Sequence, residues 1–216
     1  KTLASTMTCK MLQLGQPMLQ LFFWHGENLH GSGELLLDIH HALYDGWSLG
    51  LILDQLERAY SGAALAHQPF NKFIGYASKA DNEAGRKYWL GQLADVFDAP
   101  FPLLPSNDYS PVVDSCTDIG FQMHPTRGHT SATALKLAWA MVLSQYSESS
   151  ETVFGLVTSG RNASIDGIEH ICGPTITTVP FYFRPRRSQT VADELIRVRE
   201  QLAHMAPHEQ FGLHSI

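Results

Sequence analysis

The 216-residue sequence lacks several features that would assign it at once to a class of protein. It has three cysteines, Cys9, Cys116 and Cys172, an odd number at wide spacing that favours thiols in a reducing compartment over a disulfide framework. A formal charge of −6 provides no basic face for nucleic acid or an anionic membrane. No apolar run approaches the roughly 20 residues that span a bilayer, and no signal peptide opens the chain. We therefore expect a cytoplasmic protein with neither a nucleic-acid nor a membrane partner.

What is present is an ordinary α/β composition. The hydrophobic content of 44% can supply the core of one or two domains. The chain has 11 histidines but no Cys-x-x-Cys pair, and we expect no metal site. The histidines matter instead because two of them are adjacent in one turn.

The most informative segment is the turn His40-His41-Ala42-Leu43-Tyr44-Asp45-Gly46-Trp47-Ser48. An apolar run at 35–39 precedes it and predicts a buried strand, whereas apolar residues at helical spacing over 49–60 predict an amphipathic helix. Ser48 is a candidate N-cap for that helix, and Gly62 is a candidate for its C-terminal stop. Side chains at the end of a strand, on a tight turn into a helix, are well placed to build a site.

The two imidazoles are expected to face in different directions. Successive strand residues point to opposite faces, so an extended backbone places His41 on the face of Leu37 and Ile39, and His40 on the other face. A neutral imidazole can accept or orient the proton of an attacking amine. One histidine, and not both, is therefore expected to serve a given cavity.

The rest of the chain predicts further strands and helices. We expect a strand near 19–23 and a helical region from about 70 to 93. A proline-rich stretch at 100–111 breaks regular structure and indicates a crossing between lobes. Alternation of Ile119, Phe121 and Met123 predicts the next strand.

Two helices are predicted after this strand. Thr130 can cap a helix over 131–146, whose apolar residues lie nearly all round it and indicate burial between layers. A narrow apolar stripe that begins at Val191 predicts a last helix, which Pro207 ends.

The histidine turn resembles the H-H-x-x-x-D-G motif of nonribosomal peptide synthetase condensation domains, including the Trp-Ser that commonly follows it. Three later segments resemble the same family in order. Residues 153–161 are similar to its strand ending in Ser-Gly-Arg, 173–180 to its Gly-x-x-x-Asn-Thr-x-Pro segment in a form typical of fungal members, and 208–213 to the short motif after the next helix. Thr177 stands where that segment usually has Asn. The resemblance covers nearly the whole chain.

The resemblance implies a fold and a division of the chain. The expected fold is α/β, a two-lobed chloramphenicol-acetyltransferase-like sandwich. A complete domain of this family is about twice as long, so we expect an internal segment, incomplete at both ends. Residues 1–98 would end the first lobe and carry the histidine motif, 99–117 would cross between lobes, and 118–216 would start the second lobe. We expect such a piece alone to be a poor catalyst.

The resemblance also implies a reaction, amide-bond formation between a carrier-bound acyl or peptidyl thioester and a carrier-bound aminoacyl amine. It places the chemistry on His41 and leaves His40 a structural part of the motif. Gly46, at the start of a helix, could present its backbone N–H to the developing oxyanion. Asp45 is expected to form a structural ion pair with Arg161 across the lobes, because an unpaired buried carboxylate is costly.

Further expectations concern a substrate tunnel, the partner proteins and the alternative functions. Candidates for the substrate tunnel are Trp47, Ser48 and Thr177. No cofactor is expected in the domain itself, because phosphopantetheine arms would be delivered by upstream donor and downstream acceptor carrier proteins, next to an adenylation domain. Three alternatives stay open. An epimerization domain would need a carboxylate opposite His41, and a terminal cyclisation domain often has Ser at the position of His40. The third alternative is a non-catalytic remnant or interaction module.

Overall fold

The computed structural model describes residues 15–25, 33–65, 68–79, 82–94, 96, 101–106, 108–122, 128–186 and 188–216. Two residues used above, Cys9 and Met123, lie outside these ranges. The two cysteines inside them, Cys116 and Cys172, are thiols. In the described part of the chain no helix is long and apolar enough to cross a membrane.

The chain divides into two compact units. The first comprises residues 1–76 and 163–176, and the second comprises 77–162 and 177–216. The lobe boundaries expected from the resemblance do not coincide with this division, and they stay a prediction.

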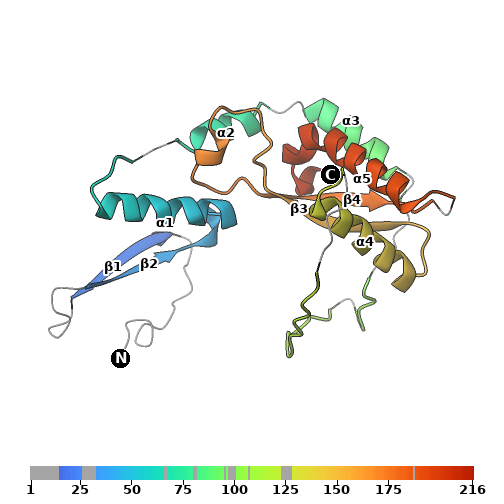
Figure 1. Cartoon of the computed structure of the whole chain (residues 1–216), viewed down its shortest axis with the longest axis horizontal. Helices are drawn as coiled ribbons and strands as arrows, with labels where there is room; N and C mark the ends of the chain where they lie inside the picture. Colours follow the sequence, from blue (N-terminus) through green and yellow to red (C-terminus); the bar gives the residue numbers. More distant parts are fainter. Residues whose placement is uncertain are drawn as a thin grey trace. The chain divides into compact units, whose positions relative to one another are not determined.

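The first unit contains a β-hairpin and several helices (Figure 1). Its elements are β1 (Leu19–His25), β2 (Gly33–Ile39), the 3₁₀ helix η2 (His41–Leu43), α1 (Gly46–Tyr60), α2 (Asn71–Ala77), which ends at the unit boundary, and the 3₁₀ helix η3 (Ile168–His170). The strands pair antiparallel with Leu19 opposite Ile39. Alternate residues of β1 and β2 turn towards α1, as the period of two in a strand requires.

Residues 163–176 return to the first unit from far along the chain. Ile168 and Ile171 are buried against Phe73 of α2, and a parallel bridge joins Gln68 to Ile171. This small core fixes the returning segment, which also carries one of the sequence motifs.

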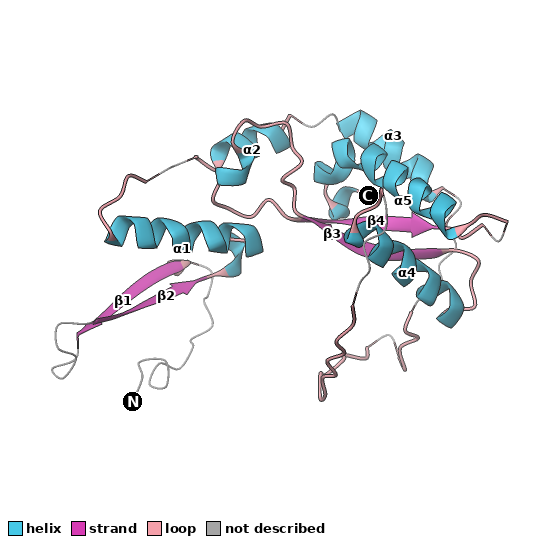
Figure 2. Ribbon diagram, viewed as in Figure 1, coloured by secondary structure: helices cyan, strands magenta, loops and turns pink. Residues whose placement is uncertain are grey.

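The second unit is a two-stranded sheet with helices packed against it (Figure 2). Its elements are α3 (Asn82–Leu93), α4 (Ser131–Tyr146), β3 (Thr152–Thr158), β4 (Thr177–Phe183), α5 (Val191–Met205), and the 3₁₀ helices η4 (Ala206–Phe211) and η5 (Leu213–Ser215). β3 and β4 pair antiparallel. Val179, Phe181 and Phe183 alternate along β4 and are buried against side chains of α3, α4 and α5.

Several predicted elements are confirmed. Thr130 caps α4, because its hydroxyl accepts a hydrogen bond from Thr133 N–H at 3.2 Å. Gly62 follows α1 with a φ of +72°, the left-handed conformation that suits glycine after a helix. α5 ends at Met205, and Pro207 lies in the following 3₁₀ helix. These signals are local, so the sequence could reveal them.

Two expectations about secondary structure need correction. The helical region at 70–93 is two helices, α2 and α3, separated by a turn at Ser78 and Lys79. Residues 109–122 form no strand, and Ile119 and Phe121 are 79% and 68% exposed. Alternation makes a strand only where a partner strand and a face to bury are available.

The predicted helix over 131–146 is confirmed as α4, and its expected burial between layers stays a prediction. Leu137, Ala140 and Leu143 are buried, but Trp139 and Met141 are exposed in the described structure. The described residues therefore cover one side of this helix.

The start of α5 gives a pH-dependent prediction. Thr190 and Asp193 form a capping box, and the pKa of the Asp193 carboxyl is lowered by hydrogen bonds from the Thr190 hydroxyl and then the Thr190 N–H. A lowered folded-state pKa adds stability above the ordinary pKa of aspartate, and this contribution disappears as the pH falls through the lowered value. Asp193→Asn should therefore lower the urea midpoint at neutral pH, and the difference from wild type should shrink in acid. Glu200→Gln, on the same helix, is the charge-matched control. A difference for Asp193→Asn that is independent of pH would contradict this assignment.

Candidate functional site

The histidine pair lies where β2 gives way to a 3₁₀ turn. His40 N–H donates to the Met18 carbonyl at 2.8 Å and continues the hairpin ladder by one residue beyond β2. The chain then turns into η2, and His40 is its N-cap. His41 is therefore not in an extended strand, and the argument that strand alternation separates the two rings is wrong. Their hydrogen bonds distinguish them instead.

The His41 ring is held so that one nitrogen remains basic. Its Nδ1 lies 2.9 Å from the main-chain carbonyl oxygen of Tyr44. A carbonyl oxygen only accepts, so the neutral ring carries its proton on Nδ1 and has its lone pair on Nε2. The side chain is exposed. Nε2 is thus the basic atom of the neutral His41 ring.

The His40 ring has the opposite arrangement. Its Nδ1 accepts a hydrogen bond from Ala42 N–H at 3.0 Å, so the neutral ring carries its proton on Nε2. The basic nitrogen of His40 is therefore used to cap η2. The two rings therefore differ in their hydrogen bonds, while the catalytic role expected for His41 and the structural role expected for His40 stay predictions.

Asp45, and not Ser48, is the N-cap of α1. The Oδ1 atom of Asp45 accepts from Ser48 N–H at 2.7 Å and from the Ser48 hydroxyl at 2.6 Å, while Ser48 Oγ accepts from Asp45 N–H at 2.8 Å. Ser48 is the third helical residue of this reciprocal capping box. Both side chains are fully buried. Ser48 thus has a structural part here, and its expected contact with substrate stays a prediction.

The second carboxylate oxygen of Asp45 binds a distant segment of the same unit. Oδ2 accepts from Thr175 N–H at 2.9 Å and from the Thr175 hydroxyl at 3.3 Å. The Ser48 hydroxyl also lies 3.3 Å from the Gly173 carbonyl oxygen. Asp45 therefore ties the histidine turn to the Gly-Pro-Thr-Ile segment. Sequence reasoning missed Thr175, although it had singled out both segments as motifs.

The other predicted site residues are placed as follows. Gly46 is the first residue of α1, and a Cβ atom added to it would meet nothing within 4 Å. The indole Nε1–H of Trp47 donates to the Glu169 carbonyl at 2.9 Å, while 53% of the residue is exposed. Arg161 and Thr177 belong to the second unit, where Thr177 pairs with Thr158 at the start of β4. The Asp45–Arg161 ion pair and the tunnel role of Thr177 stay predictions.

Gly173 gives a test of the returning segment. Its φ is +150°, and a Cβ atom would lie 2.3 Å from a ring carbon of Phe70. Gly173→Ala should therefore destabilise the protein by about 1–3 kcal/mol, the range for overpacking. Gly50→Ala is the matched control, because its Cβ meets nothing within 4 Å and alanine favours a helix. Equal urea midpoints for the two variants would contradict the packing described here.

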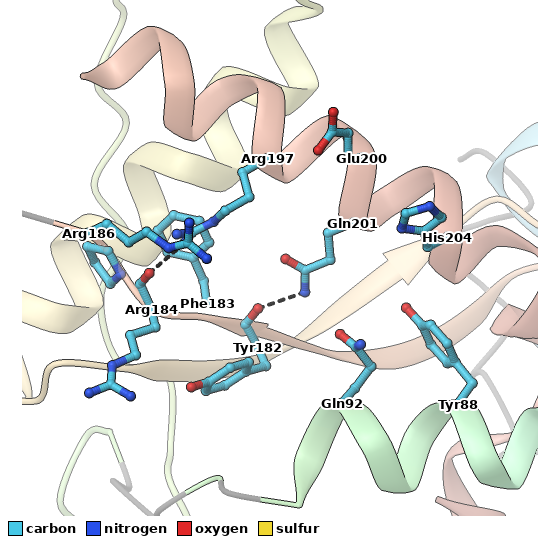
Figure 3. A pocket seen from close by; sticks show the side chains of 11 residues that line it. Tyr88, Gln92, Tyr182, Phe183, Arg184, Arg186, Arg197, Glu200, Gln201 and His204 are labelled. Carbon is cyan, nitrogen blue, oxygen red and sulfur yellow. Dashed lines mark hydrogen bonds between the residues drawn. The ribbon is translucent and has the colours of Figure 1, made fainter. Parts of the chain in front are cut away.

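Each unit contains a cavity next to its helices. In the first unit an apolar cavity of about 480 Å³ lies between the hairpin and α1, and its walls include Ile39, Leu43 and Cys172. In the second unit a cavity of about 740 Å³ is lined by α3, β4 and α5 (Figure 3). Neither lining includes His41.

The edge of β4 inside the larger cavity is closed by side chains of α5. Gln201 donates to the Tyr182 carbonyl at 2.7 Å, and Arg197 donates to the Arg184 carbonyl (Figure 3). Arg197 also binds Glu194 at 3.0 Å and lies over the Phe183 ring. The guanidinium group is therefore already engaged in holding the strand edge to the helix.

Histidine spacing in the second unit does not create a metal centre in the described structure. His204 and His208 lie four residues apart, but no group of three His, Cys, Asp or Glu side chains among the described residues could hold a metal ion. The His208 ring stacks on Tyr88, with centroids 4.5 Å apart, and burial raises the pKa of Tyr88 to about 12. This pair is part of the packing of α3 on η4.

Comparison with known proteins places the chain in a family. The family model described as Condensation domain matches residues 19–216. The chain therefore belongs to the condensation-domain family, as the sequence motifs indicated.

Its relatives include fungal nonribosomal peptide synthetases. The synthetase ftmPS of Neosartorya fischeri is 40% identical over 187 residues, which cover 85% of this chain and 8% of that protein. The synthetase otaB of Aspergillus carbonarius is 39% identical over 184 residues, 85% of this chain and 10% of that protein. The synthetase fmqA of Aspergillus fumigatus is 37% identical over 207 residues, 94% of this chain and 5% of that protein. The chain thus spans a tenth or less of these relatives.

Solved structures confirm the fold class. A structure titled "The crystal structure of CT" matches with a TM-score of 0.67 at 24% identity and covers 84% of this chain and 42% of its own. The first condensation domain of the CDA synthetase matches with a TM-score of 0.56 at 19% identity, and the match covers 90% of this chain and 47% of that one. The epimerization domain from the third module of tyrocidine synthetase B matches with a TM-score of 0.62 at 14% identity. This match covers 93% of the present chain and 50% of that domain's chain. The chain has the chloramphenicol-acetyltransferase-like α/β fold of these domains and spans about half of each.

Proposed function

We propose that this chain carries the amide-forming site of a nonribosomal peptide synthetase. The site would join a carrier-bound acyl or peptidyl thioester to the amine of a carrier-bound aminoacyl group. The observation that carries the proposal is the hydrogen bond from His41 Nδ1 to the Tyr44 carbonyl. It leaves Nε2 as the basic nitrogen of an exposed side chain, on the turn that defines the family motif.

The chemistry follows from what amide formation requires. The amine nitrogen attacks the thioester carbonyl carbon, the carbonyl oxygen becomes an oxyanion, and the C–S bond then breaks to release a thiolate. The His41 Nε2 atom accepts or orients the proton that the amine loses. An N–H in the first turn of a helix has no acceptor within the helix, so Gly46 N–H is suited to stabilise the oxyanion.

Asp45 has a structural part in this proposal. Each of its carboxylate oxygens already accepts two hydrogen bonds, from Ser48 and Thr175. A buried carboxylate with these partners is suited to hold the turn in shape and is poorly placed to move protons. Arg161 would add an ion pair to this arrangement.

The proposed partners follow from the substrates. Upstream donor and downstream acceptor carrier proteins would present their thioesters on phosphopantetheine arms, and an adenylation domain would charge the acceptor. The domain itself would hold no cofactor. We place this assembly in the cytoplasm, where Cys116 and Cys172 would stay as thiols.

The experiment that tests this function uses the full protein that contains the chain. Donor and acceptor carriers are loaded, the reaction is run in D₂O, and the thioester-bound products are analysed by mass spectrometry. We expect an amide-linked product on the acceptor carrier without deuterium at the α-carbon. α-Deuterated aminoacyl thioester without a new amide would indicate epimerization instead. Cyclic product released from the carrier would indicate terminal cyclisation. If none of these products forms, the result would indicate a non-catalytic module.

A further inference from the structure

Tyr44 contacts the His41 imidazole in two separate ways. Its main-chain carbonyl accepts the Nδ1–H at 2.9 Å. Its ring stacks on the imidazole, with centroids 4.5 Å apart and planes 8° from parallel. The hydrogen bond selects the nitrogen that carries the proton, and the stacked ring limits rotation of the imidazole.

The ring contact matters because the turn around it is open. η2 is three residues long and contains no buried residue, so its own packing does not hold the His41 side chain. A single hydrogen bond leaves an imidazole free to swing about the N–H···O axis. An aromatic ring laid flat against one face removes that freedom and keeps Nε2 pointing in one direction.

We infer that Tyr44 is a positioning residue, whose ring holds His41 for the amide-forming reaction. The inference rests on the proposed function, and it adds a residue that the motif leaves variable. The interaction free energy of a stacked aromatic pair corresponds to a change in rate of roughly 3- to 10-fold. Loss of the ring should act on kcat, because Tyr44 holds the base and need not touch the carriers.

Substitutions at Tyr44 can separate its two contacts. Tyr44→Ala removes the ring but keeps the main-chain carbonyl, whereas Tyr44→Phe keeps both. Tyr60→Ala is the matched control, because Tyr60 ends α1 and is 95% exposed. In the full protein with loaded carriers, Tyr44→Ala should lower kcat roughly 3- to 10-fold at unchanged KM. Tyr44→Phe and Tyr60→Ala should match wild type.

A spectroscopic measurement tests the same inference without activity. The ¹⁵N chemical shifts of His41 should show mainly the Nδ1–H form in wild type and Tyr44→Phe, and a larger share of the Nε2–H form in Tyr44→Ala. Wild-type kcat and wild-type shifts in Tyr44→Ala would overturn the inference. If His41→Ala is inactive while Tyr44→Ala is unaffected, only this inference fails. If His41→Ala is fully active, the proposed function fails as well.

Discussion

In the full protein, His41→Ala is expected to lower the rate of amide formation by about 10²-fold or more, the range for losing a general base. The physical reason is that Nε2 is unprotonated in the neutral ring of the exposed His41 side chain, because Nδ1–H is committed to the Tyr44 carbonyl. The rate is measured as amide-linked thioester formed on the acceptor carrier, with both carriers loaded before mixing.

His40→Ala is the matched control for this prediction. It removes the imidazole that caps η2 through Ala42 N–H, so we expect it to act chiefly by lowering stability. A folded His40→Ala protein should keep most of its rate. Similar losses of rate in the two folded variants would contradict the separation of roles that the hydrogen bonds indicate.

The second large effect is expected at Asp45. Asp45→Ala would leave the buried Ser48 and Thr175 donors without their carboxylate, and it would remove the N-cap of α1. We expect a loss of about 3–5 kcal/mol in the free energy of unfolding, the cost of breaking a buried charged network. Asp45→Asn keeps a cap oxygen and should cost less. Urea unfolding of the variants measures both.

The proposed ion pair with Arg161 is tested by a double-mutant cycle. If the pair forms, Arg161→Ala alone should destabilise the protein, and the double variant with Asp45→Ala should cost less than the sum of the two single changes. Strictly additive losses would argue against the pair. They would leave the Asp45 network with Ser48 and Thr175 intact, because those hydrogen bonds are independent of Arg161.

The helical signals were predictable because they are local. Thr130 and Gly62 act on their own helices, and a few neighbouring residues carry the information. The same logic explains the error at α1. Asp45 and Ser48 are both good N-cap residues, and a capping box uses one as the cap and the other as its partner. The sequence analysis named Ser48 as the cap and assigned Asp45 only to an ion pair, so it missed the capping role of Asp45.

The site was predictable only as far as its motif. His41, Asp45 and Gly46 could be named, because they lie in one short segment that resembles a family pattern. The orientation of the His41 ring could not, because it depends on where β2 ends and on a 3₁₀ turn. The contact of Asp45 with Thr175 spans 130 positions, and no local pattern encodes such a distance.

The false strand at Ile119 and Phe121 has a similar cause. Alternation of apolar residues records which side chains could share a face, but a strand also needs a neighbour to pair with. The pairing of β3 with β4 satisfies that need, whereas residues 109–122 lie without regular structure. Strand formation is thus a property of two segments, and one sequence window does not contain it.

The most direct test of the central claim is the single-turnover rate of amide formation by the full protein, compared between wild type and His41→Ala. Both proteins are checked for equal folding, and both carriers are loaded before mixing, so that binding and charging do not limit the rate. The account predicts that His41→Ala forms the amide at least about 10²-fold more slowly. Equal single-turnover rates would contradict the assignment of His41 as the base.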